Sequence, residues 1–132
     1  TQFCSFWVAY NYGVYVAGLF LMAFESIERY FLIFHERFVR KWCFIIHYPP
    51  ILICFICPLI FYNLIVNIYP CENVYSYVAY VCGGACYQFQ AIIDTLVYLI
   101  HVVFPTMFII FATMILLLHL TYQKQAMKLE NT

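Results

Sequence analysis

The chain has 132 residues, of which 67% are hydrophobic and only 9% charged, and its formal net charge at pH 7 is zero. With a mean hydropathy of +0.89, this composition lies outside the range of soluble domains, so we expect a membrane protein with a few crossings of the bilayer. The balanced charge argues against nucleic-acid binding, which requires a basic face.

The first predicted helix covers residues 3–34. Its segment Phe6–Phe24 has no charged side chain over 19 residues, close to the roughly 20 apolar residues that span a bilayer. At spacings of three and four residues, one face carries a stripe of polar and small residues: Asn11, Tyr15, Gly18, Met22, Glu25 and Arg29. Because such a stripe avoids lipid and faces other helices or a water-filled cavity, we expect this helix to belong to a bundle.

Residues 35–48 are predicted to form an inner loop, and residues 49–69 a second helix. The chain between Lys41 and Glu72 has no charged residue. Pro49 and Pro50 favour a helix start at that point, because proline in a first turn gives up an amide that has no helical partner.

The outer loop, residues 70–90, is rich in Tyr and Val and is interrupted by Gly83 and Gly84. Two glycines between strand-like runs are typical of a tight β-hairpin, since they accept the positive φ angles of its turn. An irregular loop tethered by disulfides fits the same residues equally well. Three cysteines of this loop are available for such bonds: Cys71, Cys82 and Cys86.

The third predicted helix covers residues 91–122, and residues 123–132 form a tail. No charged residue lies between Asp94 and Lys124. Asp94, Tyr98, His101 and Pro105 share one helical face.

The basic residues set the orientation, because all six lie on one side of the predicted membrane. They are Arg29, Arg37, Arg40, Lys41, Lys124 and Lys128. By the positive-inside rule, the first loop and the C-terminus are cytoplasmic, and the N-terminus and the outer loop are outside. We therefore predict an all-α, multi-pass protein of the cell membrane with three transmembrane helices. Its outer cysteines, Cys4 included, lie where disulfides persist.

An enzymatic function is not indicated. The four histidines are scattered without the spacing of metal ligands, no nucleophile is paired with a base, and no glycine-rich loop precedes a helix. We expect neither a metal nor another cofactor.

At the inner end of the first helix, Glu28, Arg29 and Tyr30 form the sequence "ERY", and Cys4 precedes Arg29 by 25 residues. A cysteine-bearing loop follows the second helix, and Pro105 lies within the third. In these features the chain resembles the third to fifth helices of the rhodopsin-like (class A) G-protein-coupled receptors. The resemblance implies a partial seven-helix receptor bundle. Nothing in the chain corresponds to the other four helices, so it also implies an incomplete receptor.

The resemblance implies roles for the residues at the inner end. The carboxylate of Glu28 would restrain Arg29 at rest, and agonist binding would free the arginine to engage a heterotrimeric G protein. The surface for this partner would include Phe34 or Phe38 and a basic run formed by Arg37, Arg40 and Lys41. The positive-inside rule explains this basic run equally well.

The resemblance also implies a ligand site and a disulfide. Asn11 lies where receptors for amines carry an aspartate, which disfavours a monoamine and leaves a peptide or a chemosensory ligand. Tyr15, Tyr98 and His101 would line the same pocket, although Tyr98 and His101 can instead bond to neighbouring helices. A disulfide is expected from Cys4 to the outer loop, with Cys86 preferred to Cys82 and with Cys71 then paired to Cys82.

Two other functional classes stay open. A transporter or channel subunit requires a polar path and a helix break near mid-membrane, for which Pro105 is the one candidate. A non-signalling membrane partner would associate with receptors as part of an oligomer.

Overall fold

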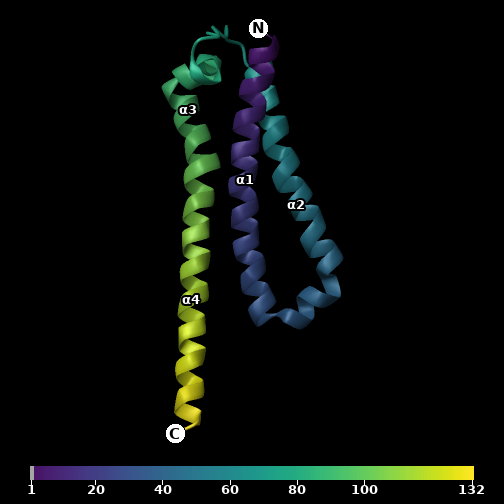
Figure 1. Ribbon diagram of the computed structural model, residues 1–132, viewed down its shortest axis with the longest axis vertical. Helices are drawn as coiled ribbons and strands as arrows, with labels where there is room; N and C mark the ends of the chain where they lie inside the picture. Colours follow the sequence, from purple (N-terminus) through teal and green to yellow (C-terminus); the bar gives the residue numbers. More distant parts are fainter. Residues whose placement is uncertain (1) are drawn as a thin grey trace.

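The computed structural model describes residues 2–132, with the backbone alone at residue 81, and consists of long helices joined by one turn and one folded loop (Figure 1). In chain order the elements are α1 (Gln2–Phe34), α2 (Glu36–Asn67), the 3-10 turns η1 (Tyr80–Gly83) and η2 (Cys86–Phe89), α3 (Ala91–Tyr98), the π-helical segment η3 (Leu99–Val103) and α4 (Phe104–Glu130). The described residues are therefore mostly helical, with an irregular loop after α2, and contain no strand.

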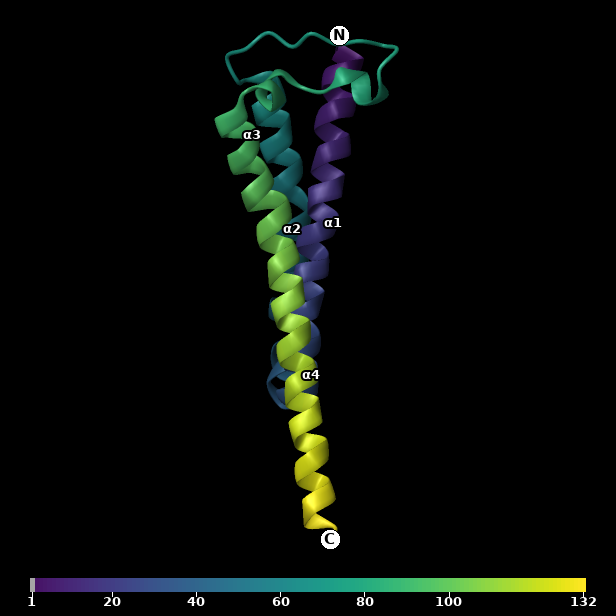
Figure 2. The ribbon, with the colours of Figure 1, turned by 90° about the vertical axis from the view of Figure 1, so that its left-hand side faces the viewer.

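The central helix is α1, which contacts both α2 and α4, whereas α2 and α4 do not contact each other within residues 2–132. The helices α1 and α2 lie side by side near the N-terminus and separate toward the turn that joins them (Figure 1). The N-terminus and the folded loop lie at one end of the molecule, and α4 extends past the other helices at the opposite end (Figure 2).

Helix α2 begins at Glu36 and not at the predicted Pro49, so the expected inner loop is reduced to a turn at His35. Residues 35–48 contain neither Gly nor Pro, and nothing in them stops a helix. The chain instead bends at Trp42, whose φ of −112° and ψ of 16° are not helical. Pro49 and Pro50 lie inside the helix, where each removes one backbone hydrogen bond to a carbonyl four residues earlier.

The elements α3, η3 and α4 form one continuous helix of 40 residues, Ala91–Glu130. Its π-helical segment precedes Pro105, and the amide of Phe104 donates to the carbonyl of Leu99, five residues earlier. A proline leaves a carbonyl without its usual partner, and a π turn is one way to rearrange the bonds around it. The helix runs beyond the predicted end at residue 122 because residues 123–130 contain no helix breaker.

The loop between α2 and α3 forms no hairpin, and among its described residues the flanks of the glycine pair are short 3-10 turns. Gly83 and Gly84 adopt the expected positive φ angles, +83° and +86°. Side-chain bonds fix the loop to the helices: Asn73 Nδ2 donates to the carbonyl of Val66 at 3.0 Å, and Ser5 Oγ donates to the Tyr75 hydroxyl at 3.1 Å. The loop is therefore the irregular, tethered alternative.

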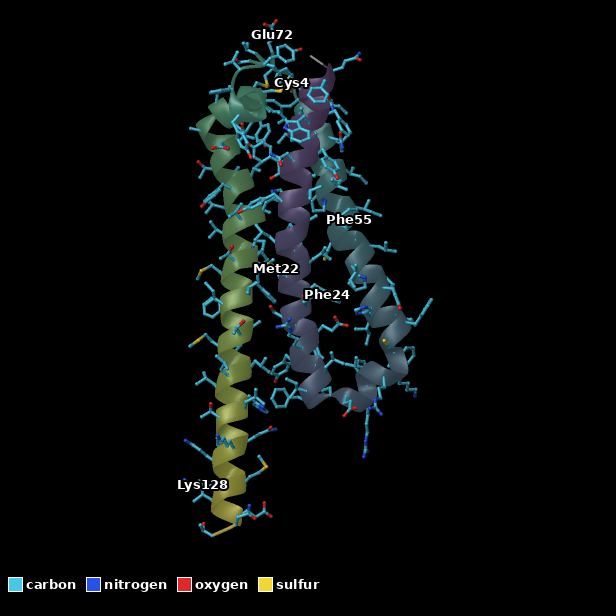
Figure 3. The ribbon with its side chains drawn as sticks, in the orientation of Figure 1. Cys4, Met22, Phe24, Phe55, Glu72 and Lys128 are labelled. Atoms are coloured by element: carbon cyan, nitrogen blue, oxygen red, sulfur yellow. A yellow bond between two sulfur atoms is a disulfide. The ribbon has the colours of Figure 1, made fainter. Side chains whose placement is uncertain are left out.

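Two disulfides close this loop, and their pairing differs from the preferred one. Cys4 is bonded to Cys82 and Cys71 to Cys86, with Cα–Cα distances of 5.8 and 6.2 Å that are normal for disulfides. The expected bond from Cys4 to Cys86 is absent, since Cys86 lies beside Cys71, where its amide also donates to Asn73 Oδ1 at 2.8 Å. Figure 3 shows Cys4 at the same end of the molecule as Glu72, opposite Lys128.

The buried core lies under this loop, at the outer end of α1 and α2. It consists of small and β-branched residues with two tyrosines and the cysteines: Cys4, Val8, Ala9, Val16, Tyr62, Val66, Cys82, Ala85 and Tyr87. Along α4 only Pro105 is buried, and large apolar side chains such as Phe104, Phe111 and Leu118 are exposed.

This exposure fits a membrane environment. Within residues 2–132, two helices are long and apolar enough to cross a bilayer: Glu36–Asn67 and Ala91–Glu130. Helix α1 is not one of these two, so the third predicted crossing stays a prediction.

Candidate functional site

A cavity of about 290 Å³ lies under the outer loop, between α1, α2 and α3. Half of its lining residues are tyrosines, and the full wall consists of Tyr12, Tyr15, Val16, Tyr62, Tyr87, Gln88, Asp94, Val97, Tyr98 and Val102. A second hollow of about 470 Å³ adjoins it and shares Tyr12, Tyr15 and Gln88. Together the two form one recess that is covered by the disulfide-bonded loop.

The fold fixes one side of this cavity firmly. Tyr12 of α1 stacks on Tyr62 of α2, with ring centroids 6.0 Å apart, and both Tyr62 and Tyr87 belong to the buried core. Loss of solvent, followed by repulsion from nearby ionisable groups such as Tyr62, raises the pKa of the Tyr87 phenol. The Tyr87 hydroxyl is therefore neutral at physiological pH.

Of the four predicted ligand-site residues, Tyr15 and Tyr98 line the cavity together, and Asn11 lines the adjoining hollow with Tyr15. His101 lies elsewhere. The centroid of its ring lies 4.6 Å from that of Phe61 and 5.6 Å from that of Tyr62. Its Nδ1 is 3.1 Å from the carbonyl oxygen of Val97. The structure thus places His101 in a packing cluster between helices.

Five polar wall residues were not among the predicted site residues: Tyr12, Tyr62, Tyr87, Gln88 and Asp94. The sequence gives little indication of the three tyrosines in this set, because thirteen tyrosines are spread over the chain. Only the fold shows which of them lie at the cavity. Asp94 carries a clearer signal, since it is the one carboxylate between Glu72 and Glu130.

At the opposite end of α1, the carboxylate of Glu28 contacts Nδ1 of His47, on α2. The Glu28 side chain is 13% exposed and that of His47 36%. Arg29 is exposed and forms no ion pair within residues 2–132. The expected restraint of Arg29 by Glu28 is therefore not the contact that this structure contains.

The other predicted residues at this end divide into two groups. Tyr30 and Phe34 pack against His119 of α4, with ring centroids 6.3 and 4.0 Å from that of the imidazole. Phe38 is 56% exposed. The basic run is exposed as well, and its ion pair from Arg40 to Glu36, at 2.6 Å, lies on the surface.

The polar stripe of α1 faces away from the helix's buried side. Tyr15, Met22, Glu25 and Arg29 are exposed, whereas the buried side carries Cys4, Val8, Ala9, Gly13, Val16, Ala17 and Ala23. Two of its members, Asn11 and Tyr15, line the hollow and the cavity, whereas the exposed Met22, Glu25 and Arg29 are covered by no other helix of the described residues.

No family model, curated protein or solved structure matches this chain. The arguments about function therefore come from the residues themselves.

Proposed function

We propose that the chain forms the third to fifth transmembrane helices of a rhodopsin-like G-protein-coupled receptor in the cell membrane. The observation that carries this proposal is the placement of two features on one unbroken helix, α1. Cys4 binds the outer loop near one end of the helix, and the Glu28–Tyr30 motif lies near the other. A helix of this length, at about 1.5 Å per residue, reaches across a bilayer.

The charge distribution supports this orientation. Every basic residue lies at or beyond Arg29 on α1, around the turn into α2, or at the end of α4. The recess under the disulfide-bonded loop would then open to the outside and receive an extracellular ligand. Helices beyond this chain would cover the polar stripe of α1, as in a seven-helix bundle.

On this proposal, Arg29 is the residue that engages the G protein. Its exposed guanidinium is available at the cytoplasmic end, while Glu28 is held by His47. Tyr30 and Phe34 connect the motif to α4 through His119. Through these ring contacts, a displacement of α1 or α4 would also displace the other helix.

The test is basal nucleotide exchange on a purified heterotrimeric G protein. The protein is expressed in membranes together with the helices that the family pattern requires, and Arg29→Ala is compared with Lys128→Ala, an exposed basic residue near the end of α4 that lies outside the proposed G-protein surface. We expect Arg29→Ala to lower exchange at least tenfold and Lys128→Ala to leave it within twofold. Normal exchange by the Arg29→Ala protein, or none by the unsubstituted protein, would overturn the proposal.

A second candidate is a non-signalling membrane partner, which the exposure of nearly all of α4 favours. Such a protein would bind other helices along α4 but would not promote nucleotide exchange. Copurification with receptor helices in the absence of any exchange would support it.

A further inference from the structure

Asp94 is an unpaired charge in the wall of the outer cavity. It is half-buried, and it is the one carboxylate among the residues that line the cavity. Its side chain has no ion pair or hydrogen-bond partner within residues 2–132.

No basic side chain of the described residues can neutralise Asp94. The chain has no Lys or Arg between Lys41 and Lys124, and all six such residues lie at the other end of the molecule. His101, two turns along the same helix, packs among aromatic rings with its Nδ1 at the carbonyl of Val97. A charge from outside the chain is therefore the fitting partner for this carboxylate.

The position of Asp94 in the first turn of α3 explains why a carboxylate is tolerated there, because the positive end of the helix dipole favours it. This effect does not require the side chain to line a cavity. The surroundings of the cavity supply the rest of the argument.

Five tyrosines line the same space: Tyr12, Tyr15, Tyr62, Tyr87 and Tyr98. Tyr15 and Tyr98 form its open side, with exposures of 58% and 56%. Tyr62 and Tyr87 are buried, with exposures of 3% and 2%, so their rings are already ordered before any ligand binds. The faces of such rings attract cations, and an aromatic enclosure is the usual way in which proteins hold an ammonium group. A carboxylate beside the rings adds a direct charge partner.

We propose that this cavity binds the ammonium group of an extracellular ligand, with Asp94 as its charge partner and the five tyrosines as its enclosure. The inference deepens the proposed receptor function by naming the ligand chemistry. Asn11 disfavours a monoamine because it offers no charge on α1; in this proposal the charge lies on α3 instead, at Asp94, and Asn11, which lines the adjoining hollow, offers a neutral amide to the remainder of the ligand. The ammonium group can belong to a small molecule or to a lysine of a peptide, and the test separates these two sources.

The test compares cations with uncharged molecules of the same shape. Choline is paired with 3,3-dimethylbutan-1-ol, and N-acetyl-lysine amide with N-acetyl-norleucine amide. Binding to the purified chain is measured by saturation-transfer NMR in maltoside micelles, which contain no choline headgroup. We expect at least one cation to bind tenfold or more tightly than its neutral partner, and the tighter cation identifies the source.

Four variants locate the effect. Asp94→Asn should remove the preference for the cation, whereas Glu72→Gln, on the exposed part of the loop, should preserve it. Tyr15→Leu should weaken cation binding severalfold and Tyr15→Phe should restore it, because phenylalanine keeps the ring. Circular dichroism and disulfide mapping of each variant confirm that the fold is kept.

Equal affinity for a cation and its neutral partner in both pairs would overturn the proposal, as would an unchanged preference in a folded Asp94→Asn protein. The binding assay contains no G protein. A failure of nucleotide exchange therefore leaves this result intact, and a failure of cation binding leaves the exchange result intact.

Discussion

Helix α1 packs tightly against Leu59 of α2 at Gly13, and the chain supplies a matched control at Gly18. A Cβ atom added at Gly13 would lie 2.8 Å from Leu59 Cδ2 and 3.2 Å from Leu59 Cα, whereas one added at Gly18 would have no neighbour within 4 Å. Both glycines lie inside α1. The substitutions Gly13→Ala and Gly18→Ala therefore differ in packing and not in backbone setting.

The expected difference in stability comes from the contact with Leu59 alone. Replacing a helical glycine by alanine gains about 0.5–1 kcal/mol at either site, because alanine loses less backbone freedom on folding. At Gly13 the side chain of Leu59 can rotate away but its Cα cannot, and overpacking of this kind costs about 1–3 kcal/mol. Since the helix gain cancels between the two variants, Gly13→Ala should be less stable than Gly18→Ala by about 1–3 kcal/mol.

Both variants would be purified in mild detergent and unfolded by added sodium dodecyl sulfate, with helix content followed by circular dichroism. The difference between their unfolding free energies is the measured quantity. Gly13→Ala should unfold at lower dodecyl sulfate than the unsubstituted chain, and Gly18→Ala at the same or a higher concentration. If the two variants unfold together, α1 and α2 do not meet at Gly13, and the packing argument fails.

Three further predictions concern the two ends of the molecule. Peptide mapping should find Cys4 bonded to Cys82 and Cys71 to Cys86, and a Cys4–Cys86 peptide would contradict the pairing. Cys4→Ser should lower the free energy of unfolding by about 4 kcal/mol, because it opens a long covalent loop. Cys43→Ser, at an exposed free thiol, should leave that free energy unchanged. His47→Leu leaves the carboxylate of Glu28 without its partner and should destabilise the chain by about 1–3 kcal/mol. A double-mutant cycle with Glu28→Leu measures the coupling energy of the pair, and a coupling energy near zero would contradict the contact. A membrane-impermeant thiol reagent added outside cells should label Glu72→Cys and spare Gln123→Cys, and the opposite pattern would reverse the topology.

The sequence predicted the long helices because uninterrupted apolar runs leave a chain in lipid few alternatives to helix. It did not predict the start of α2, since Pro49 and Pro50 signal a helix start only where the preceding residues do not already form a helix. The residues from Glu36 to Tyr48 do form one. A proline pair inside a helix is tolerated in membrane proteins because neighbouring groups can satisfy the freed backbone, and no local pattern in the sequence reports this.

The disulfide pairing could not be predicted from the sequence, for a different reason. Cys82 and Cys86 lie on either side of the same glycine pair, and position along the chain does not decide which of them reaches α1. In the fold, the side chain of Asn73 binds the amide of Cys86 and the carbonyl of Val66, and these contacts between distant residues are not visible in the sequence. Similarly, the sequence placed His101 with Tyr98 on one helical face, but only the fold shows the rings of Phe61 and Tyr62 that surround His101.

The two candidate sites are joined by a single rigid element, α1. Tyr15 and Arg29 lie about 21 Å apart along this helix at 1.5 Å per residue, and both belong to the exposed polar stripe. On the proposed function, a ligand in the cavity would contact both α1, through Tyr12 and Tyr15, and α3, through Asp94. Below the packing cluster around His101, α1 and α4 meet again through Tyr30, Phe34 and His119. If α1 shifts at the cavity relative to the continuous helix of α3, η3 and α4, the shift must be accommodated at one of two places. One is the π turn before Pro105, where the hydrogen bonding is already irregular. The other is the set of contacts beside Arg29. The second alternative connects ligand binding to the motif without any change in the backbone of α1.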